Sequence, residues 1–159
     1  MKSLRGAPIS LDLTLQSGQV FHWDKQADGS WTGLIGDTPV RVSEGNGFLH
    51  IPKGAESLAR NYFSLDHPLE EIYAAFPTDP MSVEALSLCR GLRIIRQPRW
   101  ECLATFITSS MKQVAHIRSM SLALRKAFGR PTEHGYTYPS PASLAASNEQ
   151  SLRACGLGY

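Results

Sequence analysis

The sequence predicts an α+β protein, in which an antiparallel sheet domain with short helices comes first and an all-helical part follows. Two observations support this prediction. Apolar and polar residues alternate between residues 11 and 51, with turn residues between the runs, as in half-buried strands. From about Ala55 onward the apolar spacing becomes that of amphipathic helices.

The alternating part predicts short strands joined by tight turns. Leu11, Leu13 and Leu15 alternate with polar residues before a break at Gly18, which predicts an opening strand. Further strands are predicted at residues 20–23, 31–35, 40–42 and 48–51. Turn sequences rich in Gly, Asp and Asn separate them, so we expect an antiparallel meander.

The helical part begins with two short helices, predicted at residues 69–76 and 81–89. A third helix is predicted from Pro98, because proline is favoured in the first turn. It is expected to bury an apolar face made of Trp100, Leu103, Phe106 and Ile107.

Residues 110–113 read as a capping box, with Ser110 as the cap and Gln113 three residues later. The helix that follows is expected to bury Val114, Ile117, Leu124 and Phe128 and to end at Gly129. Ser140 and Asn148 are predicted to start two further helices. The glycine-rich turn at residues 156–159 connects to no further element, which indicates a truncated all-helical domain.

Composition excludes several classes of protein. The chain has 159 residues, 42% hydrophobic and 19% charged, so it is neither disordered nor fibrous. It contains no apolar run long enough to span a bilayer, and residues 1–6 lack the apolar stretch of a signal peptide. Three cysteines without a CxxC pair argue against a disulfide scaffold or a cysteine zinc site. We therefore expect a cytoplasmic protein.

The charge is divided unevenly along the chain. Residues 1–88 carry six Lys or Arg against eleven Asp or Glu, whereas residues 89–159 carry ten against three. A basic half is typical of proteins that bind a polyanion such as nucleic acid. A solvated helix face that complements the acidic half is the alternative, and charge alone does not decide between them.

Motifs for catalysis are absent: the sequence has no GxSxG, HExxH, P-loop or GxGxxG. The five histidines show no metal-ligand spacing, and no cofactor is expected. Lys112, His116 and Arg118 lie near a predicted helix start, where a phosphate is favoured. Tyr159 is either an aromatic that wedges between bases or a terminal residue that packs on the nearest helix.

Five stretches in order together resemble the 8-oxoguanine DNA glycosylase family. They are LDLTLQSGQVFHW (11–23), NYFSLD with LEEIY (61–73), IRQ with WECLATFITSS (95–110), YPSP (138–141) and LRACGLGY (152–159). The resemblance implies an N-terminal antiparallel sheet domain over residues 1–96. It also implies the start of a helix-hairpin-helix glycosylase domain over residues 97–159, truncated before the catalytic motif.

The same resemblance implies base-excision repair by a monomer acting on damaged double-stranded DNA. Such enzymes flip oxidised purine out of the duplex. A lysine then attacks the sugar, and the resulting Schiff base permits strand cleavage by AP lyase activity. That lysine and an assisting aspartate are expected beyond Tyr159, so this chain alone is expected to be inactive. It would associate with the bacterial nucleoid through DNA.

Residue by residue, the resemblance carries over only in part. Gly18 matches the glycine whose carbonyl accepts the extra N7 hydrogen of oxidised guanine, and Tyr159 matches a tyrosine that wedges into the duplex. Met111, Lys112 and Gln113 stand in place of an asparagine run that fills the vacated gap. His116 stands where many members have an arginine that reads the opposite cytosine. A non-catalytic DNA-binding module and a structural or protein-interaction domain are the alternative functions.

Overall fold

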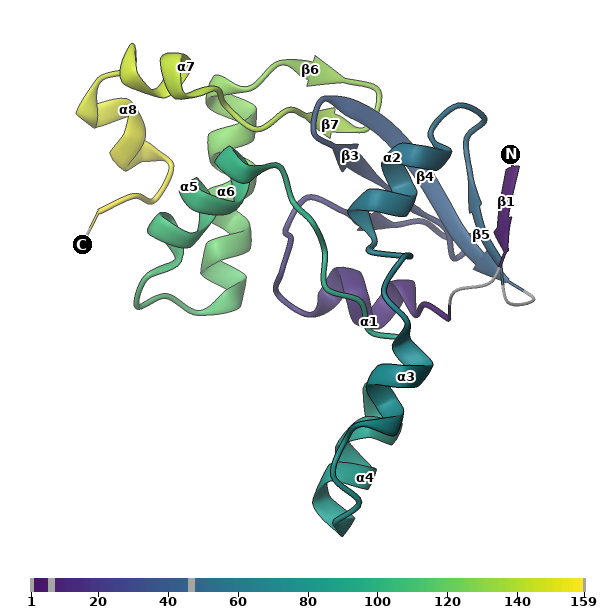
Figure 1. The fold of residues 1–159 in the computed structure, drawn as a ribbon. Coiled ribbons are helices and arrows are strands. Elements are labelled where there is room, and N and C mark those ends of the chain that lie inside the picture. The colour runs from purple at the N-terminus through teal and green to yellow at the C-terminus, as the bar shows by residue number, and fades with distance from the viewer. Residues whose placement is uncertain (1, 6–7, 46–47, 159) are drawn as a thin grey trace. The chain divides into compact units, whose positions relative to one another are not determined.

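The computed structural model describes residues 2–5, 8–45 and 48–158, and Figure 1 shows its ribbon. The chain forms two compact units. The first unit comprises residues 1–19, 25–31 and 41–96, and the second comprises residues 20–24, 32–40 and 97–159. In the described residues no helix combines the length and apolar character needed to cross a membrane.

A five-stranded sheet has the strand order β1-β5-β4-β3-β2. Its strands are β1 (Lys2–Arg5), β2 (Asp24–Lys25), β3 (Trp31–Ile35), β4 (Thr38–Gly45) and β5 (Phe48–Ile51). Strand β5 pairs antiparallel with both β1 and β4, so that Leu49 lies opposite Leu4 on one side and Glu44 on the other. Together with the helices, this sheet confirms the predicted α+β fold.

The predicted opening strand at residues 11–15 is wrong, because this segment forms helix α1 (Leu11–Gln16). The side chain of Ser10 caps the helix by accepting a hydrogen bond from the Leu13 amide. Leu11, Thr14 and Leu15 are buried, whereas Leu13 is exposed. Burial therefore follows the i, i+3, i+4 spacing of a helix, and the alternation of leucines was misleading.

Residues 20–23, also predicted as a strand, form irregular backbone in the second unit. All four side chains are buried, so they do not alternate between a core face and a solvent face. Trp23 occupies the space beside Gly33 of β3: a Cβ on Gly33 would lie 2.5 Å from the Trp23 ring. This segment therefore contributes its side chains to the hydrophobic core.

The helices of the first unit are α1, α2 (Glu56–Tyr62), α3 (Leu69–Ala74) and α4 (Pro80–Leu88). The predicted helices at 69–76 and 81–89 correspond to α3 and α4. Asp79 caps α4 by accepting a hydrogen bond from the Ser82 amide at 3.0 Å. Helix α4 buries none of its residues, and Figure 1 shows α3 and α4 extending away from α1 and α2.

The second unit is built on the packed helices α5 (Arg99–Ser109) and α6 (Val114–Phe128). A short hairpin of β6 (Pro131–Thr132) and β7 (Gly135–Tyr136) follows, and then α7 (Pro141–Ala145) and α8 (Glu149–Ala154). Ser140 and Asn148 cap α7 and α8, which confirms the two predicted helix starts. Helix α6 ends at Gly129, as predicted.

Two predictions about α5 and α6 are wrong. Ser110 does not open α6, because Met111 adopts a left-handed backbone conformation (φ 57°) that no helix continues through. Gln113 is the N-cap instead, and its side chain makes no capping hydrogen bond.

The apolar face predicted to be buried on α5 is largely exposed: Leu103 is 54%, Phe106 73% and Ile107 61% accessible. The buried residues of α5 are Glu101 and Ala104. On α6, Ile117 and Leu124 are buried as predicted, whereas Val114 is exposed. A small alanine and an ion pair thus replace the large apolar contacts that the pattern predicted.

Candidate nucleic-acid interface

Gly18 lies in the turn that follows α1 in the first unit. Its φ of +85° is in the left-handed region, which glycine adopts without the steric cost of a Cβ. A Cβ at this position would meet nothing within 4 Å, so backbone conformation and not crowding requires glycine here. The preceding Ser17 closes the helix end, because its hydroxyl donates to the Thr14 carbonyl at 2.9 Å.

Arg93 holds the irregular segment at residues 93–96 beside α1. It is 1% accessible. Its Nε donates to the Pro8 carbonyl at 3.0 Å, and its Nη1 donates to the Ser64 carbonyl at 2.7 Å. The Arg93 amide donates to the Thr14 hydroxyl. Burial lowers the pKa of Arg93. These buried contacts therefore hold residues 93–96 in place next to the Gly18 turn.

In the second unit, four of the predicted DNA-contacting residues lie on or beside the turn between α5 and α6. Met111 is 95% accessible, although it is a large apolar side chain on a left-handed backbone. Gln113 and His116 are exposed in the residues that start α6. An exposed thioether on such a backbone is rare in a folded protein and marks a candidate contact surface.

The segment at residues 156–158 packs against this turn. The ammonium of Lys112 donates to the Gly158 carbonyl at 3.3 Å. A Cβ on Gly156 would lie 3.4 Å from His116 Nε2, so the two segments are in close contact. A pocket lies between them, lined by Ile107, Thr108, Ser110, Lys112, Leu157 and Gly158. We call residues 110–116 and 156–158 the turn surface.

The structure thus brings Met111, Lys112, Gln113 and His116 together on one surface. Gly18 belongs to the first unit and the turn surface to the second. Tyr159 lies outside the described residues.

The opposite end of the α5–α6 pair contains a buried ionic cluster. Glu101 Oε1 accepts a hydrogen bond from Arg125 Nη2 and lies 3.4 Å from His22 Nδ1. His22 Nε2 lies 2.8 Å from the Leu34 carbonyl oxygen, and because a carbonyl only accepts, this nitrogen carries a proton. The Arg125 guanidinium also lies over the Tyr138 ring at 5.2 Å.

Burial sets the charges in this cluster. It lowers the pKa of His22 to about 3, and the nearby Arg125 cation acts in the same direction. Burial raises the pKa of Glu101, whereas Arg125 opposes that rise. His22 is therefore neutral at pH 7. The cluster joins α5 to α6 and to the segment at residues 20–24, away from the turn surface.

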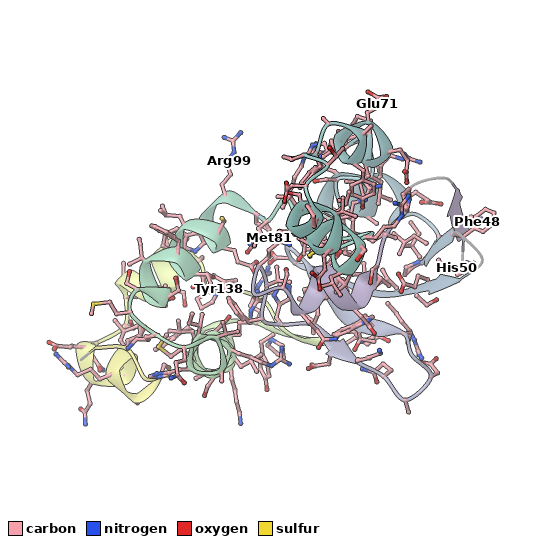
Figure 2. The ribbon with its side chains drawn as sticks, turned by 90° about the horizontal axis from the view of Figure 1, so that it is seen from below. Phe48, His50, Glu71, Met81, Arg99 and Tyr138 are labelled. Carbon is pink, nitrogen blue, oxygen red and sulfur yellow. The ribbon has the colours of Figure 1, made fainter. Side chains whose placement is uncertain are left out.

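Ion pairs neutralise much of the basic charge of the second unit. Arg118, Arg125, Arg130 and Arg153 pair with Asp24, Glu101, Asp37 and Glu149 respectively. Among the described residues, Arg99 and Lys126 form no ion pair, and Figure 2 shows Arg99 extending into solvent from α5. The cationic groups exposed for a polyanion are therefore fewer than the composition indicates.

Within the described ranges, no three His, Cys, Asp or Glu side chains gather as a metal site requires. The predicted phosphate site at Lys112, His116 and Arg118 is divided, because Arg118 is bound to Asp24 Oδ1 at 2.8 Å. Gln19 and Arg93 were not predicted to have a role. The sequence did offer one sign of a role for Gln19. It is a polar residue between the turn glycine Gly18 and residues 20–23, which are apolar or aromatic and are buried in the structure.

A family model described as the N-terminal domain of 8-oxoguanine DNA glycosylase matches residues 4–103. The chain belongs to this family. Among curated relatives, N-glycosylase/DNA lyase OGG1 of Arabidopsis thaliana is 30% identical, over 95% of this chain and 45% of that protein. The chain spans about half the length of the curated relatives it matches.

Two solved structures are similar to this chain in fold. MBOgg1, in complex with a low-affinity DNA ligand, matches 100% of this chain and 62% of its own, with a TM-score of 0.91 at 30% identity. The 8-oxoguanine glycosylase/lyase of Clostridium acetobutylicum, in complex with duplex DNA that has cytosine opposite 8-oxoG, gives 0.88 at 24% identity. It covers 96% of this chain and 56% of its own. The resemblance inferred from the five motifs is confirmed.

Proposed function

We propose that this chain is the lesion-recognition part of a base-excision repair enzyme that removes 8-oxoguanine from duplex DNA and cleaves the strand as an AP lyase. Family membership is the observation that carries the proposal. The names of the curated relatives as N-glycosylases and DNA lyases support it. The partner is damaged double-stranded DNA, and the complete protein acts as a monomer.

Within this proposal, residues 1–96 are the N-terminal domain and residues 97–159 begin the glycosylase domain. The nucleophilic lysine and the assisting aspartate belong to sequence beyond Tyr159, since the relatives are about twice as long as the matched part. The chain alone is then inactive in excision. Its compartment is the one that holds DNA, which is the cytoplasm in a bacterial cell.

Gly18 is proposed to recognise the lesion. Its carbonyl accepts the N7 hydrogen that oxidised guanine has and guanine lacks, so an acceptor there discriminates between the two bases. The left-handed φ of Gly18 supports this role, because the turn departs from the helical direction of α1 at that residue. Met111, Lys112, Gln113, His116 and Tyr159 are proposed to contact DNA at the gap left by the flipped base.

Binding of short labelled duplexes tests the proposal, with fluorescence anisotropy measured for 8-oxoG·C and G·C duplexes of the same sequence. We expect the chain to prefer the damaged duplex, and its affinity to fall as the salt concentration rises. Gly18→Ala is expected to reduce that preference by about tenfold, since the strained turn displaces one hydrogen-bond acceptor. Equal affinity for both duplexes in the wild-type chain would contradict lesion recognition.

A non-catalytic DNA-binding module that uses the basic second half of the chain is the second candidate function. Borohydride trapping on a duplex with an abasic site separates the two. The longest product of the gene should form a covalent adduct if it is a lyase, because reduction fixes the Schiff base. A product that binds DNA but never forms an adduct would be a binding module.

A further inference from the structure

Gln19 follows Gly18 directly, and its side-chain amide forms hydrogen bonds with Ser17, Arg93 and Ile95 within the first unit. Its Oε1 accepts from the Ile95 amide at 2.8 Å. Its Nε2 donates to the Arg93 carbonyl at 2.9 Å and to the Ser17 hydroxyl at 2.9 Å. One side chain therefore binds both the far side of the turn and the backbone of a segment more than seventy residues away.

These contacts imitate the pairing of neighbouring strands. An extended segment offers alternating amide and carbonyl groups along its edge. The Gln19 amide satisfies one donor and one acceptor of residues 93–95, as a partner strand would. That segment is itself fixed, since Arg93 is 1% and Ile95 7% accessible. The turn is thus anchored to a segment that is itself held in place.

We propose that Gln19 is a positioning residue that holds the Gly18 carbonyl in the orientation that recognises the damaged base. The inference rests on the proposed function of Gly18. Gln19 itself acts through the backbone, because its amide is occupied by Ser17, Arg93 and Ile95. A turn with an unrestrained glycine samples many conformations, and restraining it reduces the ordering cost of binding.

The hydrogen-bond pattern requires an amide. In Gln19→Glu the Nε2 donor becomes an acceptor, which faces the Arg93 carbonyl and repels it, while the acceptor for Ile95 remains. Gln19→Met keeps the length of the side chain but removes both functions. Gln16→Glu is the matched control: it makes the same chemical change three positions earlier, at an exposed site.

Two measurements test the proposal on the 159-residue chain. The first is the ratio of affinities for 8-oxoG·C and G·C duplexes. The second is the set of amide-to-Hα NMR couplings of Gly18, which report its φ directly. Both Gln19 variants should lower the ratio by about tenfold, which is the loss expected for one misplaced hydrogen bond. They should also shift the Gly18 couplings toward values averaged over several φ angles, because the turn is no longer held in one conformation. Affinity for the undamaged duplex should change by less than about twofold, since phosphate contacts are retained.

Gln16→Glu should leave both measurements unchanged. The positioning role would be overturned if the Gln19 variants kept the wild-type affinity ratio or the wild-type Gly18 couplings. It would also be overturned if they reduced the affinity for both duplexes equally. A wild-type chain that does not distinguish the duplexes would contradict the proposed function instead. The Gly18 couplings would then still decide whether Gln19 holds the turn, since they do not depend on DNA.

Discussion

His22 is a buried neutral histidine, and this makes the stability of the fold depend on pH. Its pKa is about 3 in the folded chain against 6.5 in the unfolded chain. The unfolded state therefore binds more protons between these values, so stability is full above pH 6.5 and falls as the pH falls. From pH 7 to pH 5 the expected loss is about 2 kcal/mol.

Urea unfolding at pH 7 and pH 5 checks this prediction in the wild-type chain and in His22→Gln, which cannot titrate. The raised pKa of Glu101 acts in the opposite sense, because its stabilising contribution is lost as pH rises. Both proteins retain Glu101, so the difference between their pH slopes isolates His22. Equal slopes would show that His22 is not held neutral.

Lys112 is the cation of the turn surface, and it should contribute to DNA binding through phosphate. Lys112→Ala is expected to reduce the slope of log K against log salt by roughly 0.9, the value for one lost phosphate contact. Lys126→Ala is the matched control, because Lys126 is an exposed lysine of the same unit that lies in the last turn of α6. Slopes that change equally in the two variants would contradict a phosphate contact specific to the turn surface.

The pair of helices α5 and α6 depends on a buried ion pair between Glu101 and Arg125. Glu101→Leu leaves the buried Arg125 cation without its carboxylate, and should cost about 3–5 kcal/mol of unfolding free energy. The double variant with Arg125→Met should recover most of that loss, because no buried charge remains. Chemical denaturation of the single and double variants measures both effects.

An exposed ion pair in the same unit provides the comparison. Arg153 and Glu149 pair along α8 at 2.8 Å, and both side chains are more than half accessible. Glu149→Ala is expected to cost less than about 1 kcal/mol, since solvent screens the pair. If Glu101→Leu cost no more than Glu149→Ala, the buried pair would not hold α5 and α6 together.

The elements that sequence patterns predicted correctly are those with local signals. Ser140 and Asn148 cap their helices as expected, and the turn at Gly36 lies between β3 and β4. Helix α1 was missed because its leucines satisfy both a strand and a helix pattern. The cap at Ser10 and the burial of Thr14 decide between them, and burial depends on tertiary packing.

The candidate site was predictable only in part. Motif order gave Gly18 and the turn surface, but it could not show that Arg118 is bound to Asp24. Nor could it show that Gln19 bridges to Arg93 and Ile95, since these contacts join positions more than seventy residues apart. Pairings at such separation depend on the folded backbone and leave little local trace in one sequence.

At the scale of the molecule, charge composition overstated the polyanion-binding surface. Residues 89–159 carry ten cationic side chains. Six of these cations form ion pairs with carboxylates, namely Arg90, Arg96, Arg118, Arg125, Arg130 and Arg153. The composition indicates a continuous basic face, whereas the structure leaves only a few cations without a carboxylate partner among the described residues. Salt dependence of binding should accordingly reflect a small number of phosphates.

The outer face of α5 predicts that this chain self-associates. Leu103, Phe106 and Ile107 occupy one side of the helix at i, i+3 and i+4, and each is more than half accessible. Exposed Met111 and Val114 follow in the adjoining turn and the start of α6. Contiguous apolar surface of this kind promotes association in water.

Sedimentation across a concentration series checks this prediction, together with fluorescence of a dye that binds apolar surface. Phe106→Ser with Ile107→Ser should shift the chain toward monomer and lower dye binding, without loss of helix content, because neither side chain is buried. Met81→Ser on α4 is the control, since Met81 is 79% accessible but lies in the first unit. If Met81→Ser reduced association as much as the α5 variant, general apolar exposure and not this face would be responsible.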